Sequence, residues 1–176
     1  LTLSGTNGYT GSTTVSAGIL ALAGSGSITA SSLTVNSGTT FDLSQTTSGA
    51  TVRNLSGAGT VSIGSSSQTF LVNQTSSTTF SGVMEDGGAA GGTGANFVKS
   101  GSSTLTLSAV QTYTGSTTVS AGTLALTGTG SIVNSSSLTV DSGATFDISG
   151  TSSGSTVLNF VWWWGCCFRL ASINSR

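Results

Sequence analysis

A ten-residue phrase, YTGSTTVSAG, occurs twice in the chain, at residues 9–18 and at residues 113–122. The similarity extends beyond the phrase. Residues 1–55 align with residues 105–160, and 38 of 55 aligned positions are identical, with one extra residue near Asn134. Self-similarity at this level indicates a repeat architecture, in which copies of one unit stack and bury a common core.

Short segments inside each copy alternate apolar and polar residues, as in LTL, TTV, LAL, SLTV and TFDL. Alternation with a period of two places one set of side chains on one face of a β-strand. The residues predicted to face inward are Leu1, Leu3, Val15, Leu20, Leu22, Ile28, Leu33, Val35, Phe41 and Leu43, with their counterparts Leu105, Leu107, Val119, Leu124, Leu126, Ile132, Leu138, Val140, Phe146 and Ile148. The outward positions are mostly Thr and Ser, and β-branched Thr favours an extended backbone.

Gly and small polar residues separate these strands, and Gly supplies the positive φ that sharp corners need. Strands of three to five residues joined by such corners make poor isolated hairpins, but stacked as turns of a coil each strand pairs with its equivalent in the next turn. Turns of roughly 20 residues, about 4.8 Å apart, predict an all-β fold, a right-handed parallel β-helix (solenoid) of about eight turns. A β-sandwich is the alternative, although that fold would not require identical corner sequences to recur 104 residues later in the chain.

The composition favours an ordered solenoid over a disordered segment. Ser, Thr and Gly fill more than half of the chain, yet 36% of the residues are hydrophobic and the net charge is only −1. Disordered chains usually combine low hydrophobicity with high net charge. The four basic residues, Arg53, Lys99, Arg169 and Arg176, are scattered, so nucleic acid is not an expected partner. No run of 18 apolar residues is present, so no membrane-spanning segment is expected.

Two runs, LTLSGTNGYTGSTTVSAGILAL at residues 1–22 and KSGSSTLTLSAVQTYTGSTTVSAGTLAL at residues 99–126, resemble the autotransporter-associated β-strand repeat. This repeat occurs in passenger domains of bacterial type V secretion proteins. The resemblance implies a passenger at the bacterial cell surface or in the extracellular space. It also implies a partner, an outer-membrane translocation barrel in the full-length protein through which the passenger is exported and which this chain does not contain. Because the chain begins inside a repeat, we expect it to be a piece of a longer protein.

Five acidic residues are the candidates for catalysis: Asp42, Glu85, Asp86, Asp141 and Asp147. Glycoside hydrolysis needs two carboxyl groups about 5–10 Å apart. Asp42 and Asp147 occupy equivalent repeat positions, about five turns or on the order of 24 Å apart, so they are not expected to act as a pair. Each follows a core Phe and is expected to face solvent, and Asp141 is expected to be a corner residue.

Glu85 and Asp86 open a glycine-rich loop at residues 85–94, which we consider a possible binding loop because functional residues often lie on loops of a rigid scaffold. The segment GGTGAN at residues 91–96 is similar to a calcium-binding repeat, but it has Asn where Asp is needed and occurs once. The absence of His excludes the common Ser–His and Cys–His nucleophiles and zinc sites built on His. The repeat family carries no catalytic residues either, so we expect no catalytic, cofactor or metal site and no enzymatic activity.

The function expected from the resemblance is structural, as a β-helical stalk that extends or presents a surface protein. The alternative is an adhesin that binds carbohydrate or a host ligand through the outward Ser/Thr face and the loop at residues 85–94. A polysaccharide-degrading enzyme and an ice-binding protein are further alternatives. Ice binding would require Thr-x-Thr pairs kept in register on successive turns.

The chain divides into β-helix repeats at residues 1–159 and a non-repeat tail at residues 160–176. A variant stretch separates the two copies. All three Trp and both Cys lie between residues 162 and 167, so the composition changes at one point rather than drifting. We hypothesise that the tail is the product of a frame shift near Asn159. An apolar cap over the last turn is the alternative, because such caps protect an open sheet end.

Overall fold

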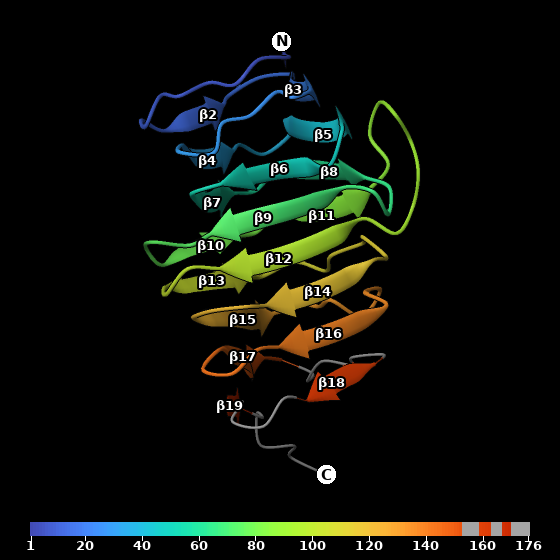
Figure 1. Ribbon diagram of the computed structural model, residues 1–176. Helices are drawn as coiled ribbons and strands as arrows, with labels where there is room; N and C mark the ends of the chain where they lie inside the picture. The colour runs from blue at the N-terminus through green and yellow to red at the C-terminus, as the bar shows by residue number, and fades with distance from the viewer. Residues whose placement is uncertain (153–158, 163–166, 170–176) are drawn as a thin grey trace.

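The computed structural model describes residues 1–152, 159–162 and 167–169, and the strands Phe160–Trp162 and Cys167–Arg169 are described through their backbone. These residues form nineteen β-strands in three parallel sheets, and no helix occurs among them. The strands stack along one axis, with the N-terminus at one end and the strands Phe160–Trp162 and Cys167–Arg169 at the other (Figure 1). The predicted all-β solenoid is confirmed.

Each sheet forms one side of the solenoid. The five-stranded sheet contains β1 (Thr2–Leu3), β3 (Ile19–Gly24), β5 (Thr40–Thr46), β8 (Thr60–Gly64) and β11 (Val83–Asp86). The six-stranded sheet contains β6 (Gly49–Val52), β9 (Thr69–Asn73), β12 (Asn96–Ser100), β14 (Ser116–Val119), β16 (Ser137–Val140) and β18 (Phe160–Trp162). The eight-stranded sheet contains β2 (Thr13–Val15), β4 (Ser32–Val35), β7 (Asn54–Gly57), β10 (Thr78–Phe80), β13 (Thr104–Leu107), β15 (Thr123–Gly128), β17 (Thr145–Thr151) and β19 (Cys167–Arg169).

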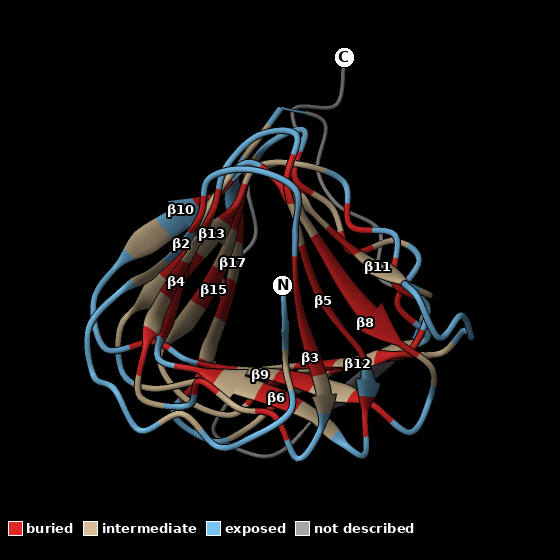
Figure 2. Cartoon of the chain, turned by 90° about the horizontal axis from the view of Figure 1, so that it is seen from above, coloured by how far each residue is buried: buried red, intermediate tan, exposed pale blue. Residues whose placement is uncertain are grey.

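The coil is right-handed. Viewed from the N-terminal end, the chain passes from the eight-stranded sheet to the five-stranded sheet and then to the six-stranded sheet, which is clockwise as it recedes (Figure 2). Residues paired between neighbouring turns are 19 residues apart where the turn is shortest, as for Thr104 opposite Thr123, and 27 where it is longest, as for Thr78 opposite Leu105. The solenoid has about seven turns, close to the eight predicted.

The two copies of the repeat lie on different sides of the solenoid. In the first copy, β2 and β4 belong to the eight-stranded sheet, whereas their counterparts β14 and β16 belong to the six-stranded sheet. In the same way β3 and β5 lie in the five-stranded sheet, and their counterparts β15 and β17 lie in the eight-stranded sheet. The 104-residue spacing therefore corresponds to four turns and two further sides, so the repeat specifies a turn of the coil and not a particular side.

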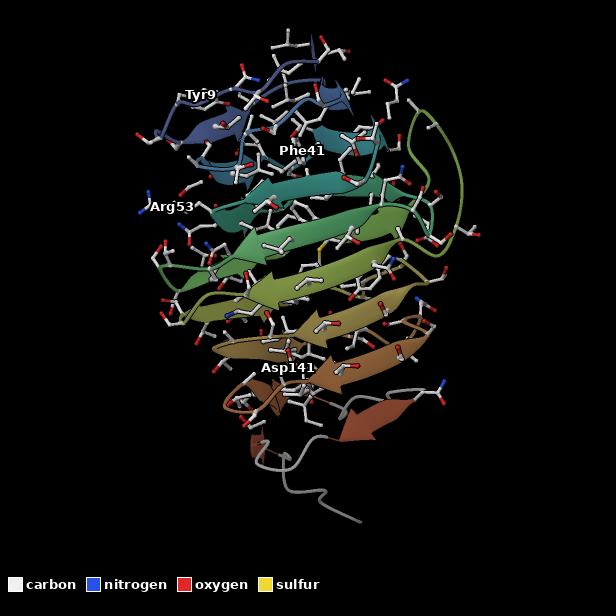
Figure 3. All side chains as sticks on the ribbon, in the orientation of Figure 1. Tyr9, Phe41, Arg53 and Asp141 are labelled. Carbon is white, nitrogen blue, oxygen red and sulfur yellow. The ribbon has the colours of Figure 1, made fainter. Side chains whose placement is uncertain are left out.

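The apolar core runs along the axis, with buried residues on the inner side of all three sheets (Figure 2). Eighteen of the twenty residues predicted to face inward are buried, whereas Leu1 is 83% exposed and Leu3 is only partly buried, because both lie on the terminal turn. Four aromatic rings follow one another through the core, with centroid separations of 6.2, 6.3 and 5.9 Å along the series Phe41, Phe70, Phe97 and Tyr113. Phe41 lies inside the solenoid, whereas the exposed Arg53 projects from its edge (Figure 3).

Gly forms corners where the backbone needs a positive φ, and Gly18 and Gly122 of the repeated phrase have φ values of 64° and 63°. A Cβ atom at Gly122 would lie 2.5 Å from the Gly101 carbonyl oxygen, whereas a Cβ atom at Gly18 would meet nothing within 4 Å. Identical residues with nearly identical backbone conformations therefore have different surroundings, because residues 99–102 of the preceding turn lie against Gly122 and no residue lies against Gly18 in this way.

The backbone of the tail continues two sheets. Phe160–Trp162 pairs with β16, with Leu138 opposite Phe160, and Cys167–Arg169 pairs with β17. The rest of the Trp and Cys cluster, including Cys166, lies outside the described residues. The frame-shift hypothesis and the cap hypothesis for this tail both stay predictions.

Candidate functional site

Asp42 is buried, with 5% of its surface exposed, so the prediction that it faces solvent is wrong. The cause is the loop at residues 87–94, which we call the strap. The strap leaves β11, crosses the outer side of the five-stranded sheet and reaches β5, two strands away (right side of Figure 1). The Ala89 N–H donates to Asp42 Oδ2 at 2.9 Å, and the Ala90 N–H donates to Ser44 Oγ at 3.0 Å.

Asp86 closes the base of the strap. Its two carboxylate oxygens accept hydrogen bonds from the backbone N–H groups of Gly94, Ala95 and Thr114, and from the Thr114 hydroxyl at 2.5 Å. Neighbouring Glu85 accepts a hydrogen bond of 2.9 Å from Ser62 Oγ. Both predicted loop residues therefore have protein partners, and the carboxylate of Asp86 ties three segments of the chain together.

The two aspartates at equivalent repeat positions, Asp42 and Asp147, are far from each other in the fold. Asp42 and Asp147 lie on β5 and β17, in different sheets and in turns well separated along the chain. Each accepts a hydrogen bond from the backbone N–H two residues later, at 2.9 Å from Ser44 and 2.8 Å from Ser149. Asp141 begins a corner in which its carbonyl oxygen accepts a hydrogen bond from Ala144 N–H at 3.0 Å.

The outer side of the eight-stranded sheet carries a column of hydroxyl residues in register. Thr14 lies opposite Thr34, which lies opposite Ser56, and further along the sheet Thr79 lies opposite Thr106. The Thr34 and Ser56 hydroxyl oxygens are 2.9 Å apart and share a hydrogen bond. Over these strands the surface is uncharged, polar and periodic. The sequence predicted Thr and Ser at outward positions, but it did not show which of them would lie opposite one another in one sheet.

Lys99 is fully buried at an inward position of β12, which sequence reasoning missed. Its ammonium group donates hydrogen bonds to the carbonyl oxygens of Gly101, Ser103 and Ala121 at 2.7, 2.5 and 2.8 Å. Burial lowers the pKa of Lys99 from its ordinary value of 10.5 to about 8. Three carbonyl acceptors match the three donors of an ammonium group, so the corner holds the charged form at neutral pH.

Two buried amide side chains form hydrogen bonds that hold other corners together. Gln111 accepts a hydrogen bond from Met84 N–H at 2.7 Å and donates to the Gly82 and Ala109 carbonyl oxygens. Gln68 donates to the Thr46 carbonyl oxygen at 3.0 Å. Their side chains supply hydrogen bonds to backbone groups at the corners, where the ladder between turns is interrupted.

Within the described part of the chain, no group of three or more Cys, Asp or Glu residues is placed to hold a metal ion. The same residues contain no helix long and apolar enough to cross a membrane.

Two segments, residues 1–22 and residues 97–126, match the family model of the passenger-associated-transport repeat. Both segments are similar to the passenger-associated-transport repeat. This agrees with the resemblance to autotransporter passengers found in the sequence, and the second match extends from within β12 to within β15. No significant match was found among curated proteins or among solved structures.

The repeat and the solenoid together fit a segment of an autotransporter passenger. The buried polar groups described above act within this framework, since Asp42, Asp86 and Lys99 all bond to backbone groups.

The two equivalent aspartates allow a matched test of the strap. We expect Asp42→Asn to lower the free energy of unfolding by about 1–2 kcal/mol, because the amide offers the strap and Ser44 one acceptor oxygen instead of two. Amide hydrogen exchange at Ala89 should also become faster. Asp147→Asn, outside the reach of the strap, should cost less. Urea denaturation checks the stabilities, and equal losses in the two variants would contradict this role of Asp42.

The buried ammonium group predicts a pH dependence of stability. Between about pH 8 and its ordinary value of 10.5, Lys99 is protonated in the unfolded chain but mostly neutral in the folded one. The unfolded state then binds more protons, so stability rises with pH. We expect the stability of the natural chain relative to Lys99→Met to increase from about pH 8 to about pH 9.5 in urea denaturation followed by circular dichroism. Parallel pH profiles would contradict this assignment.

Proposed function

We propose that the chain is a structural segment of a secreted bacterial autotransporter passenger, a β-helical stalk that extends or presents a surface protein. The observation that carries the proposal is the continuity of the two passenger-associated-transport repeats within one solenoid core. Each turn contacts mainly its neighbours, so adding turns lengthens the rod without a new fold. On this proposal the segment works at the bacterial cell surface or outside the cell, after export with its translocation domain.

An adhesin is the second candidate, and the hydroxyl column of the eight-stranded sheet favours it. Thr34, Ser56, Thr79 and Thr106 offer donors and acceptors at regular intervals, and hydroxyl groups of this kind can bond to a glycan. The loop with Glu85 and Asp86 supports this candidate less, because its carboxylates already bond to Ser62, Thr114 and the loop backbone. In this version the rod itself is the binding surface for a carbohydrate or a host ligand.

A display experiment tests the stalk. Residues 1–176 are placed between an N-terminal epitope and a heterologous autotransporter translocation domain, behind a signal peptide. We expect the epitope to be accessible to antibody on intact cells, and added protease to leave a resistant fragment of the solenoid. The core variant Phe70→Asp should lose the resistant fragment, because it buries a charge beside Phe41 and Phe97.

The same displayed cells separate the two candidates. The stalk proposal predicts no binding to a panel of glycans, whereas the adhesin proposal predicts binding that the double variant Thr34→Ala/Thr106→Ala weakens. An epitope that stays inside the cells, while the translocation domain inserts normally on its own, would contradict the passenger assignment.

A further inference from the structure

The strap is the most exposed segment of the solenoid. Residues 88–93, with the sequence GAAGGT, are all exposed, and no longer run of exposed residues occurs in the described part of the chain. The strap stands out from the side of the coil as a wide loop (right side of Figure 1). None of its residues belongs to the apolar core, so a change in its conformation leaves the packing of the turns intact.

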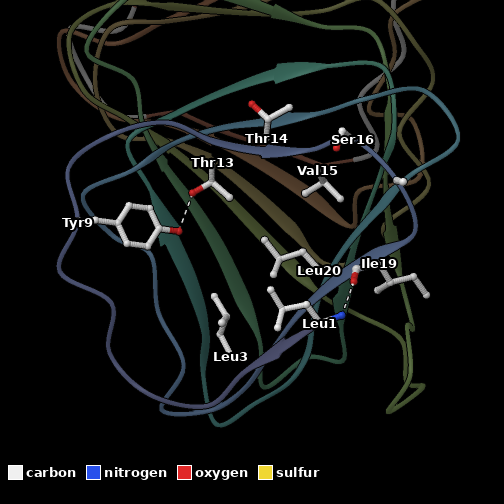
Figure 4. Close-up of a pocket in the computed structure, with 10 residues that line it drawn as sticks. Leu1, Leu3, Tyr9, Thr13, Thr14, Val15, Ser16, Ile19 and Leu20 are labelled. Carbon is white, nitrogen blue, oxygen red and sulfur yellow. Dashed lines mark hydrogen bonds between the residues drawn. The ribbon is translucent and has the colours of Figure 1, made fainter.

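The next longest exposed stretch, residues 8–12, lies on the first turn. Tyr9 lines an open pocket there and shares a hydrogen bond of 2.7 Å with Thr13 Oγ1 (Figure 4). In the second copy the equivalent Tyr113 and Gly115 are buried, and Gly115 bonds to the turn before it. The exposure of residues 8–12 therefore reflects only that no turn precedes them in the sequence. The strap has turns before and after it, so its exposure is a property of the fold.

The side chains of the strap match one class of endopeptidase. Five of its eight residues are Gly, and the other three are Ala89, Ala90 and Thr93. The S1 pocket of a serine endopeptidase sets its specificity, and Ala suits a small pocket such as that of elastase. An enzyme specific for Lys or Arg finds no target here, because the nearest basic residue in the sequence, Lys99, is fully buried.

Two hydrogen bonds hold the middle of the strap against β5. The Ala89 N–H donates to Asp42 Oδ2, and the Ala90 N–H donates to Ser44 Oγ. An endopeptidase binds its substrate as an extended backbone, so it must first lift these two residues from the sheet. The rate of cutting then depends on how often the strap opens, and Asp42 and Ser44 act as a latch.

The two ends of the strap are fixed separately from its middle. At one end the Gly87 N–H donates to the Gly64 carbonyl oxygen at 2.8 Å. At the other end the Asp86 carboxylate accepts hydrogen bonds from the N–H groups of Gly94 and Ala95. The middle of the strap is therefore able to open locally, without unfolding of the strands that flank it. Its Gly residues allow the opened backbone to become extended.

The solenoid is held together across the strap by contacts that a cut does not touch. β12 follows the strap and pairs over its whole length with β9, which precedes it, and β10 pairs in the same way with β13. The ring centroids of Phe70 and Phe97 are 6.3 Å apart in the core. The Gln111 side chain also accepts a hydrogen bond from the Met84 N–H. Two sheets and the core thus join the part before the strap to the part after it.

We propose that the strap is a processing site for an endopeptidase with a small S1 pocket, which cuts after Ala89 or Ala90 and leaves a two-piece solenoid that stays assembled. Hydrolysis adds one water molecule across the peptide bond, leaving a carboxylate on the alanine and an ammonium group on the next residue. Asp42 and Ser44 limit the rate by holding the strap closed. Processing rests on the fold and not on the stalk proposal, since a stalk and an adhesin would be cut alike.

Limited digestion of the folded 176-residue chain with pancreatic elastase tests the site, with the new chain ends identified by mass spectrometry. Within residues 1–152, we expect the first cut to leave a new N-terminus at Ala90 or Gly91. Ala58, which is exposed in a short corner, should stay uncut, because its N–H bonds to the Val35 carbonyl oxygen of the neighbouring turn. The two pieces should separate on a denaturing gel but elute together in size-exclusion chromatography without denaturant.

Variants of the chain test the latch and the specificity. Asp42→Asn and Ser44→Ala should each be cut at least about threefold faster, because the strap opens more often, whereas the matched control Asp147→Asn should be cut at the natural rate. The double variant Ala89→Asp/Ala90→Asp changes only exposed positions and should be cut at least about tenfold more slowly, since Asp does not suit a small apolar pocket. Circular dichroism checks that all variants fold.

Three results would overturn the proposal. The first is an initial cut at Ala58 or another corner within residues 1–152 while the strap stays intact. The second is separation of the two pieces in size-exclusion chromatography after the strap has been cut. The third is an equal rate of cutting in Asp42→Asn and Asp147→Asn, which would show that the strap is not held by Asp42.

Discussion

The structure depends on in-register pairing of each strand with its equivalent one turn away. This pairing satisfies the backbone donors and acceptors of the strands and at the same time aligns the inward side chains into columns. Phe70 and Phe97 illustrate the result, because they lie opposite each other on β9 and β12 and their ring centroids are 6.3 Å apart. The thin core makes every turn depend on its neighbours, and the corners must be small enough to stack, as Gly101 and Gly122 do.

The pairing determines how one turn stacks on the next, but not on which side of the solenoid a given strand lies. The same repeated sequence can therefore lie in different surroundings. The position of the two copies on different sides of the solenoid places Asp42 beneath the strap while Asp147 remains partly exposed. It also places Tyr113 against Phe97, whereas Tyr9 faces an open pocket. The differences between the copies arise from neighbouring turns, since the local bonds of the two aspartates are alike.

The sequence was sufficient to predict the solenoid and most of its core, because alternation and Gly corners are local signals. It did not predict the burial of Lys99, since a Lys in a strand is ordinarily exposed and its three carbonyl partners come from two different corners. The burial of Asp42 was missed for a similar reason, because Ala89 is 47 residues away in the chain. The sequence did not predict that the two copies lie on different sides of the solenoid, because the number of residues per turn varies and 104 residues do not make a whole number of turns.

The register and rotation of the two copies form the central claim, and spin labels can test both. In a background with Cys166 and Cys167 replaced by Ser, one double variant carries labels at Thr118 and Thr139, which lie opposite each other on β14 and β16. A second carries them at Thr14 and Thr118, the same position of the two copies. The account predicts strong dipolar broadening in the first pair, whose strands are about 4.8 Å apart, and none in the second. Broadening in the second pair, or its absence in the first, would contradict the account.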